Sequence, residues 1–172
     1  SGVIAAAYIG RFAKRPNLIT YDMGGTSTDV ALIYDCQPSI SNEIEIEYAM
    51  PIHVPMVDVR TIGAGGGSIA RVNQAGLLEV GPESAGANPG PICYGLGGEL
   101  PTITDANALL GRLDIEQFHR GQENISLERI REIFQLKIGD PLGVDAETAA
   151  SAVLRMANTL MAGAIRMVSI SL

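Results

Sequence analysis

Residues 22–29 read Asp22-Met23-Gly24-Gly25-Thr26-Ser27-Thr28-Asp29. Apolar runs at 17–21 and 30–34 flank this segment, and each run is typical of a buried strand. Two strands joined through a glycine pair form a tight β-hairpin. Because the backbone N–H groups and hydroxyls of such a turn can bind an anion, the segment indicates a phosphate site. A Gly-Gly turn that only joins two strands is the structural alternative.

Two aspartates, Asp22 and Asp29, flank this turn. A carboxylate repels phosphate unless a cation or a water lies between them. The pair therefore indicates Mg²⁺ held partly through water, or a carboxylate that orients an attacking water. The structural alternative is that each aspartate caps a turn through its own side chain.

Composition limits the classes of protein that fit. The chain has 172 residues, of which 47% are hydrophobic and 5% aromatic, enough for one good core or two small lobes. A net charge of -7 argues against a nucleic-acid partner. The two distant cysteines, Cys36 and Cys93, predict neither a zinc site nor a disulfide framework. We find no apolar run of membrane-spanning length and no signal peptide, and expect a cytoplasmic protein with no membrane partner.

The two ends of the chain predict a piece of a longer polypeptide. Ser1 stands where an initiator Met would be, and Leu172 lies within an apolar helical pattern. Between the ends, periodicity, caps and turn residues predict the elements. We expect helices at 3–14, at a short segment capped by Thr104 or Asp105, at 126–136 capped by Ser126, and at 145–170 capped by Asp145. We expect strands at 17–23 and 29–35, a half-exposed strand at 40–48, an extended segment at 51–60, a hairpin of 69–72 and 77–80, and a Gly/Pro-rich loop at 81–101.

A second glycine-rich segment has four glycines in the five positions 63–67. Such a run is neither a stable helix nor a stable strand, and it indicates close approach by another backbone or a ligand. Gly65, Gly66, Gly67 and Ser68 are therefore candidates for a second phosphate or substrate loop. A packing turn where two strands cross is an equally favoured interpretation.

Other polar residues have simpler explanations. We expect His53 to be structural, since the only other histidine, His119, lies on a polar stretch and forms no evident pair with it. Cys93 has no nearby base in the sequence, which favours a buried apolar thiol. Helix capping accounts for Asp105 and Asn107, although both could reach a ligand.

Five segments in order resemble the central domain of the hydantoinase A / 5-oxoprolinase family. They are residues 22–30, 61–70, 80–87, 89–95 and 102–107, and the resemblance runs from about residue 1 to the end. It implies an ATP-dependent amidohydrolase that opens the ring of 5-oxoproline or a hydantoin. Related large subunits serve ATP-dependent ketone carboxylases, and a non-catalytic, actin-like nucleotide-binding module is a further alternative.

The resemblance also implies a fold, namely an α/β lobe of the actin/hexokinase/Hsp70 type (ribonuclease H-like) with a mixed sheet and flanking helices. Residues 1–172 would form a single domain, with a core lobe at 1–80 and 102–172. The phosphates of ATP would be held by Gly24, Gly25, Thr26, Ser27 and Thr28, with Mg²⁺ at Asp22 and Asp29. Expected partners are the rest of the same chain and a hydantoinase B-type subunit or domain. Because the adenosine segment and the first-lobe hairpin are missing, we expect the isolated fragment to be inactive.

Overall fold

The computed structural model describes residues 2–41, 44–46, 50–52, 55–118 and 126–170. Contacts divide the chain into two compact units. Unit 1 comprises residues 1–22, 29–61 and 163–172, and unit 2 comprises residues 23–28 and 62–162. The turn at residues 23–28 thus belongs to unit 2, although the strands on either side of it lie mainly in unit 1.

Unit 1 holds one helix and a series of mostly short strands. In chain order these are α1 (Gly2–Phe12), β1 (Leu18–Met23), β2 (Thr28–Tyr34), β3 (Gln37–Pro38), β4 (Ile40–Ser41), β5 (Ile44–Ile46), β6 (Met50–Ile52), β7 (Met56–Val57) and β8 (Arg60–Ile62). The expected helix at 3–14 and strands at 17–23 and 29–35 are confirmed to within two residues.

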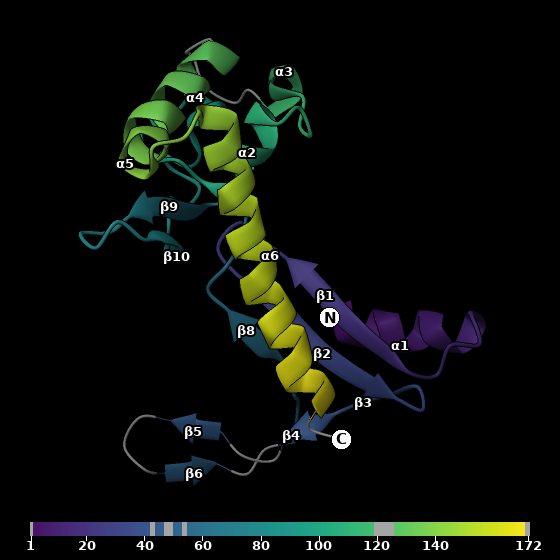
Figure 1. The fold of residues 1–172 in the computed structure, drawn as a ribbon. Helices are drawn as coiled ribbons and strands as arrows, with labels where there is room; N and C mark the ends of the chain where they lie inside the picture. Colours follow the sequence, from purple (N-terminus) through teal and green to yellow (C-terminus); the bar gives the residue numbers. More distant parts are fainter. Residues whose placement is uncertain (1, 42–43, 47–49, 53–54, 119–125, 171–172) are drawn as a thin grey trace. The chain divides into compact units, whose positions relative to one another are not determined.

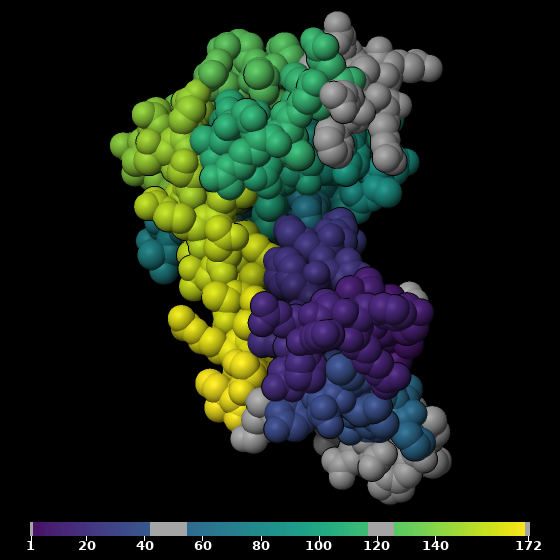
Figure 2. Space-filling model, turned by 90° about the vertical axis from the view of Figure 1, so that its right-hand side faces the viewer, coloured from purple at the N-terminus to yellow at the C-terminus, as the bar shows by residue number. Residues whose placement is uncertain are grey.

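The main sheet of unit 1 has the order β1-β2-β3, and β8 also pairs with β2. Figure 1 shows β1 and β2 running in opposite directions, which confirms the expected hairpin. The apolar residues Val30, Ala31 and Ile33 of β2 are buried, whereas Ile19 and Tyr21 of the outer strand β1 are exposed. Helix α1 also presents apolar side chains to the surface, where Figure 2 shows it in purple, and its Tyr8 and Phe12 rings lie 4.9 Å apart between centroids.

The strand expected at 40–48 is confirmed at residues 40–41 and 44–46. These residues are β4 and β5, and residues 42–43 and 47–48 lie outside the described residues. Ile40 pairs antiparallel with Val57, and Ile44 pairs antiparallel with Ile52, so both strands pair with the segment expected to be extended at 51–60.

Unit 2 is a helical layer beside one hairpin. Its elements are β9 (Ser68–Val72), β10 (Leu78–Ser84), the 3₁₀ helix η1 (Ile92–Tyr94), α2 (Ile103–Leu109), α3 (Ile115–Phe118), α4 (Leu127–Phe134), the π-helical turn η2 (Gln135–Gly139), α5 (Asp140–Leu142) and α6 (Ala146–Ile170), whose end belongs to unit 1. The hairpin expected around Asn73–Gly76 is confirmed, with Leu78 opposite Val72. The loop expected at 81–101 is shorter than predicted, because β10 continues to Ser84 and η1 lies within it.

One hydrophobic cluster forms the core of unit 2. Phe134, Ile130 and Ile138 from α4 and η2 are fully buried, and α6 contributes Val153 and neighbouring small residues. The helix expected at 145–170 is confirmed, and the Asp145 carboxylate accepts a hydrogen bond from the Thr148 amide at 2.7 Å. Leu160 of this helix is 41% exposed, whereas the adjacent Met161 belongs to the cluster.

By length and composition, α6 could cross a membrane. The expectation that no apolar run reaches that length is therefore wrong on this measure. The core helix of a soluble protein passes the same test, and the α6 residues Ala149, Val153 and Ala157 are buried in the unit 2 cluster. This part of α6 thus belongs to the unit 2 core.

The N-terminus of α2 differs from the expected one. Thr102, rather than Thr104 or Asp105, is the N-cap. The Thr102 side chain accepts a hydrogen bond from the Asp105 amide, and the Asp105 side chain accepts one from the Thr102 amide. This reciprocal pair is a capping box. Ser126 caps α4 as expected, since its side chain accepts from the Arg129 amide.

Candidate functional site

The turn between β1 and β2 is fixed by its own backbone and by the glycine-rich loop of unit 2. The Gly24 amide donates to the Ser27 carbonyl at 2.8 Å. The amides of Gly66 and Gly67 donate to the carbonyls of Gly24 and Gly25, at 2.9 and 2.6 Å. Both of these turn carbonyls therefore point at the loop.

This arrangement determines where the turn's N–H groups point. The carbonyl of Gly24 and the amide of Gly25 belong to one planar, trans peptide, in which C=O and N–H point in opposite directions. The same holds for the carbonyl of Gly25 and the amide of Thr26. Within the described residues, neither amide donates a hydrogen bond, and Gly24, Gly25 and Thr26 are exposed. Two adjacent N–H groups are thus directed away from the loop and are free to donate to an anion.

The hydroxyl residues of the turn fall into two groups. The side chains of Thr26 and Ser27 make no hydrogen bond within the described part of the chain, and Thr26 is exposed. Thr28, in contrast, is fully buried, and its hydroxyl donates to the Ala64 carbonyl. The geometry therefore leaves Thr26 and Ser27 able to reach a phosphate and gives Thr28 a structural contact.

The loop at residues 63–67 is made of glycine because the turn lies against it. A Cβ at Gly65 would lie 2.6 Å from the Ser27 amide nitrogen and 2.8 Å from the Gly24 carbonyl oxygen. The Ser68 side chain is fully buried and accepts a hydrogen bond from the Gly65 amide at 2.8 Å. Of the two interpretations of Gly65, Gly66, Gly67 and Ser68, these contacts favour the packing turn.

The flanking carboxylates, Asp22 and Asp29, lie in unit 1 and are both exposed. They line a pocket of about 520 Å³ together with Gly2, Val3 and Thr20. The Thr61 hydroxyl donates to Asp29 at 2.7 Å, whereas the Asp22 carboxylate has no hydrogen-bond partner among the described residues.

These two carboxylates are suitable oxygen ligands for Mg²⁺. No group of three or more His, Cys, Asp or Glu side chains in the described ranges could hold a metal ion. Mg²⁺ usually binds through one or two carboxylates and completes its shell with waters and substrate phosphates. Asp22 and Asp29 fit that pattern.

A buried carboxylate, Asp105, organises the loop before α2. It accepts hydrogen bonds from the amides of Ile92 and Cys93, at 3.2 and 2.8 Å, and from the amide and hydroxyl of Thr102, at 3.1 and 2.7 Å. Burial raises the pKa of Asp105, and these hydrogen bonds oppose the shift. Asp105 is thus a capping and loop-anchoring residue, as expected.

Cys93 is a buried thiol, which confirms the expectation. Burial, and then the charge of Asp105, raises the pKa of the thiol, so the nucleophilic thiolate is disfavoured. His53 and His119 lie outside the described residues. Sequence reasoning singled out Thr104 only as a candidate helix cap, whereas its amide and hydroxyl both donate to the Gly66 carbonyl at 2.8 Å.

Comparison with known proteins identifies relatives of the whole chain. The caprolactamase subunit alpha of Pseudomonas jessenii is 43% identical over 99% of this chain, which spans 25% of that subunit. The 5-oxoprolinase of Dictyostelium discoideum is 42% identical over 71% of this chain and 10% of its own length.

Two solved structures share the fold, each with a TM-score of 0.84. The nucleotide-free structure from a study of ATP-dependent acetone carboxylation is 32% identical, and the match covers 96% of this chain and 23% of that one. The crystal structure of the ATP-dependent caprolactamase from Pseudomonas jessenii is 40% identical over 97% of this chain and 24% of that one. The chain therefore spans about a quarter of each of these proteins.

The sequence model of the family Hydantoinase/oxoprolinase matches residues 1–171. Together with relatives at this level of identity, the match is decisive: the chain belongs to the hydantoinase/oxoprolinase family.

Proposed function

We propose that this chain supplies one phosphate-binding half of an ATP cleft in an enzyme that opens a cyclic amide, 5-oxoproline or a hydantoin, at the expense of ATP. One observation carries the proposal. The carbonyls of Gly24 and Gly25 are held by the glycine loop, so the amides of Gly25 and Thr26 remain available to a phosphate. Membership of the family supports the reaction class.

In this proposal ATP supplies a phosphoryl group to the amide oxygen, which makes the amide carbon a better electrophile for water. The amides of Gly25 and Thr26, with the hydroxyls of Thr26 and Ser27, stabilise the negative charge on the transferring phosphoryl oxygens. Asp22 and Asp29 directly flank the segment 23–28 in the chain, and we assign them to Mg²⁺, held partly through water. Mg²⁺ would neutralise phosphate charge during transfer.

The proposal has further parts. We assign the fold to the actin/hexokinase/Hsp70 type, which the mixed α/β architecture supports. The alpha subunit of caprolactamase and the gamma subunit of acetophenone carboxylase from Aromatoleum aromaticum are named as subunits, which supports a hydantoinase B-type partner. We also propose a cytoplasmic location, and that residues 1–172 alone lack activity.

An ATP-dependent ketone carboxylase subunit is the second candidate. The observation that favours it is the TM-score of 0.84 with the acetone carboxylase structure. The two candidates differ in co-substrate, since carboxylation consumes bicarbonate and ring opening does not.

The test is a coupled assay of ADP release by the full-length protein with its partner subunit. Separate reactions contain 5-oxoproline, hydantoin, or acetone with bicarbonate. We expect ADP release that depends on one of the cyclic amides. Release that depends only on the ketone and bicarbonate would favour the carboxylase, and nucleotide binding with no dependence on any of the three would favour a non-catalytic module.

A matched pair of variants tests the carboxylate assignment. Asp22→Asn should lower ATP-dependent turnover by two or more orders of magnitude, about the size of effect expected when a metal ligand of phosphoryl transfer is lost. Asp35→Asn makes the same chemical change at an exposed residue just after β2, whose φ of 49° asparagine tolerates, and should leave turnover unchanged. Wild-type turnover in Asp22→Asn would end the assignment.

A further inference from the structure

The carbonyl of Gly66 receives two hydrogen bonds from one residue. The amide and the hydroxyl of Thr104 each donate to it at 2.8 Å. Thr104 is the second residue of α2, where a helix leaves its amides without intrahelical partners, so the amide bond is of an ordinary kind. The hydroxyl bond is an additional one, made by a side chain that is 9% exposed.

Gly66 passes this constraint to the turn. Its amide donates to the Gly24 carbonyl at 2.9 Å, so Gly66 lies directly between α2 and the turn. Because the Gly24–Gly25 peptide is planar, the direction of the Gly24 carbonyl sets the direction of the Gly25 amide. Two hydrogen bonds and the Gly24–Gly25 peptide thus connect the Thr104 hydroxyl, through Gly66, to an N–H group that we assign to phosphate.

The start of α2, where Thr104 lies, is held in place by several hydrogen bonds. Thr102 and Asp105, on either side of Thr104, form the capping box, and Asp105 also holds the amides of Ile92 and Cys93. A Cβ at Gly66 would lie 2.8 Å from the Thr104 hydroxyl oxygen. The Thr104 hydroxyl can therefore occupy this position only because residue 66 has no side chain.

We propose that Thr104 is a positioning residue of the phosphate site, which aims the Gly25 amide through Gly66. The inference rests on the proposed function of the turn. Thr104 does not touch the phosphate in this account. Its hydroxyl reduces the freedom of the Gly66 and Gly24 peptides, so the amide is preorganised before ATP arrives.

The experiment compares threonine variants of the full-length protein. Thr104→Val keeps the shape and removes the donor, and Thr104→Ser keeps the donor. Thr159→Val removes a hydroxyl that bonds only to the Arg155 carbonyl, at an exposed position of α6. The measurements are the dissociation constant of ATP by calorimetry, the KM for ATP and kcat, and the thermal unfolding midpoint.

Thr104→Val should weaken ATP binding about tenfold, the effect of one buried hydrogen bond. The unfolding midpoint should stay well above the assay temperature. Thr104→Ser should bind ATP within about twofold of wild type, since the hydroxyl is rescued, and Thr159→Val should match wild type. Wild-type affinity in Thr104→Val, or equal losses in Thr104→Val and Thr104→Ser, would overturn the inference.

Two other outcomes are also decisive. If Thr104→Val does not fold, Thr104→Ala, which introduces no branched group, is measured by the same criteria. If the wild-type protein itself does not bind ATP, the proposed function fails, and this inference fails with it. Binding by wild type with no effect at Thr104 sinks the inference alone.

Discussion

The turn at residues 24–27 and the loop at residues 63–67 are both rich in glycine, but their backbones are used in opposite ways. In the loop, the amides of Gly65, Gly66 and Gly67 all donate inside the protein, to Ser68, Gly24 and Gly25. In the turn, the amides of Gly25 and Thr26 donate to no described residue. A high glycine content therefore indicates only that two backbones approach closely. Whether the amides donate inside the protein or stay without a partner distinguishes the supporting loop from a turn that can bind a ligand.

The largest expected effect is a difference in the free energy of unfolding between a substitution in the loop and one in the turn. Gly65→Ala places a methyl group 2.6 Å from the Ser27 nitrogen, so the turn or the loop has to move. We expect a loss of about 1–3 kcal/mol in the free energy of unfolding, as for other overpacked sites. Gly25→Ala adds a methyl group with no atom within 4 Å and should leave stability almost unchanged.

Denaturant unfolding of the two full-length variants checks this difference. A Gly65→Ala protein as stable as wild type would show that the loop is not packed against the turn as described. A folded Gly25→Ala protein with lowered ATP affinity would sharpen the comparison, because the added methyl group would then act on the ligand alone.

The next effect concerns Asp105, the buried carboxylate at the start of α2, and it depends on pH. Burial raises the pKa of Asp105 above its ordinary 3.8, so the folded state favours the protonated form. This contribution to stability is complete below pH 3.8 and is lost as pH rises through the raised pKa. Asp105→Asn is neutral at every pH and should remove that decline. It should also cost about 1–3 kcal/mol throughout, because the amide cannot accept all the hydrogen bonds that the carboxylate accepts.

Asp145→Asn is the control with the opposite sign. Hydrogen bonds from Thr148 lower the pKa of Asp145, so its contribution is present above pH 3.8 and is lost as pH falls through the lowered value. Denaturant unfolding across the acid range compares both variants with wild type. Identical pH slopes for wild type and Asp105→Asn would contradict the account of the buried carboxylate.

Much of the fold was predictable because its signals are local. Helix α6 follows from apolar spacing and the cap at Asp145, and the hairpin around residues 24–27 follows from two apolar runs and a glycine pair. The N-cap of α2 could not be predicted, because Thr102, Thr104 and Asp105 can each cap a helix. Burial of Ile103, a property of the unit 2 core, accompanies the choice of Thr102.

The candidate site divides in the same way. Residue types and order indicated the turn and its aspartates. The contact between the turn and the loop joins segments about forty residues apart, and no local pattern shows to which carbonyls the loop amides will donate. For the same reason Thr28 and Ser68 could not be recognised as buried residues with internal partners.

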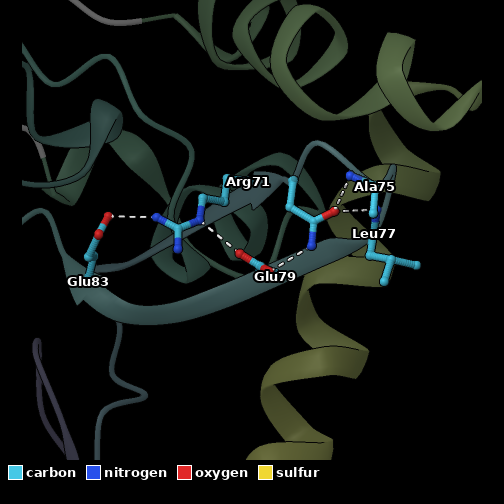
Figure 3. Close-up of polar contacts among 6 residues, drawn as sticks. Arg71, Ala75, Leu77, Glu79 and Glu83 are labelled. Carbon is cyan, nitrogen blue, oxygen red and sulfur yellow. Dashed lines mark hydrogen bonds and ion pairs between the residues drawn. The ribbon is translucent and has the colours of Figure 1, made fainter.

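The smallest expected effect lies on the hairpin that follows the glycine loop. Arg71 on β9 forms ion pairs with Glu79 and Glu83 of β10, at 3.0 and 2.9 Å, and Asn73 donates to Glu79 (Figure 3). The hydrogen bond from Asn73, and to a smaller extent the one from Arg71, lowers the pKa of Glu79. All of these charged side chains are at least 40% exposed, and exposed ion pairs contribute little because water and salt screen them.

Arg71→Gln should therefore lower the unfolding midpoint slightly at low salt and not at all at high salt. Arg129→Gln, at a similarly exposed arginine of α4 paired with Glu132, is the matched control and should behave alike. ATP affinity should be unchanged in both variants. If Arg71→Gln weakened ATP binding as much as Thr104→Val, the turn would be positioned by the hairpin as well as by α2, and the route through Gly66 would lose its special role.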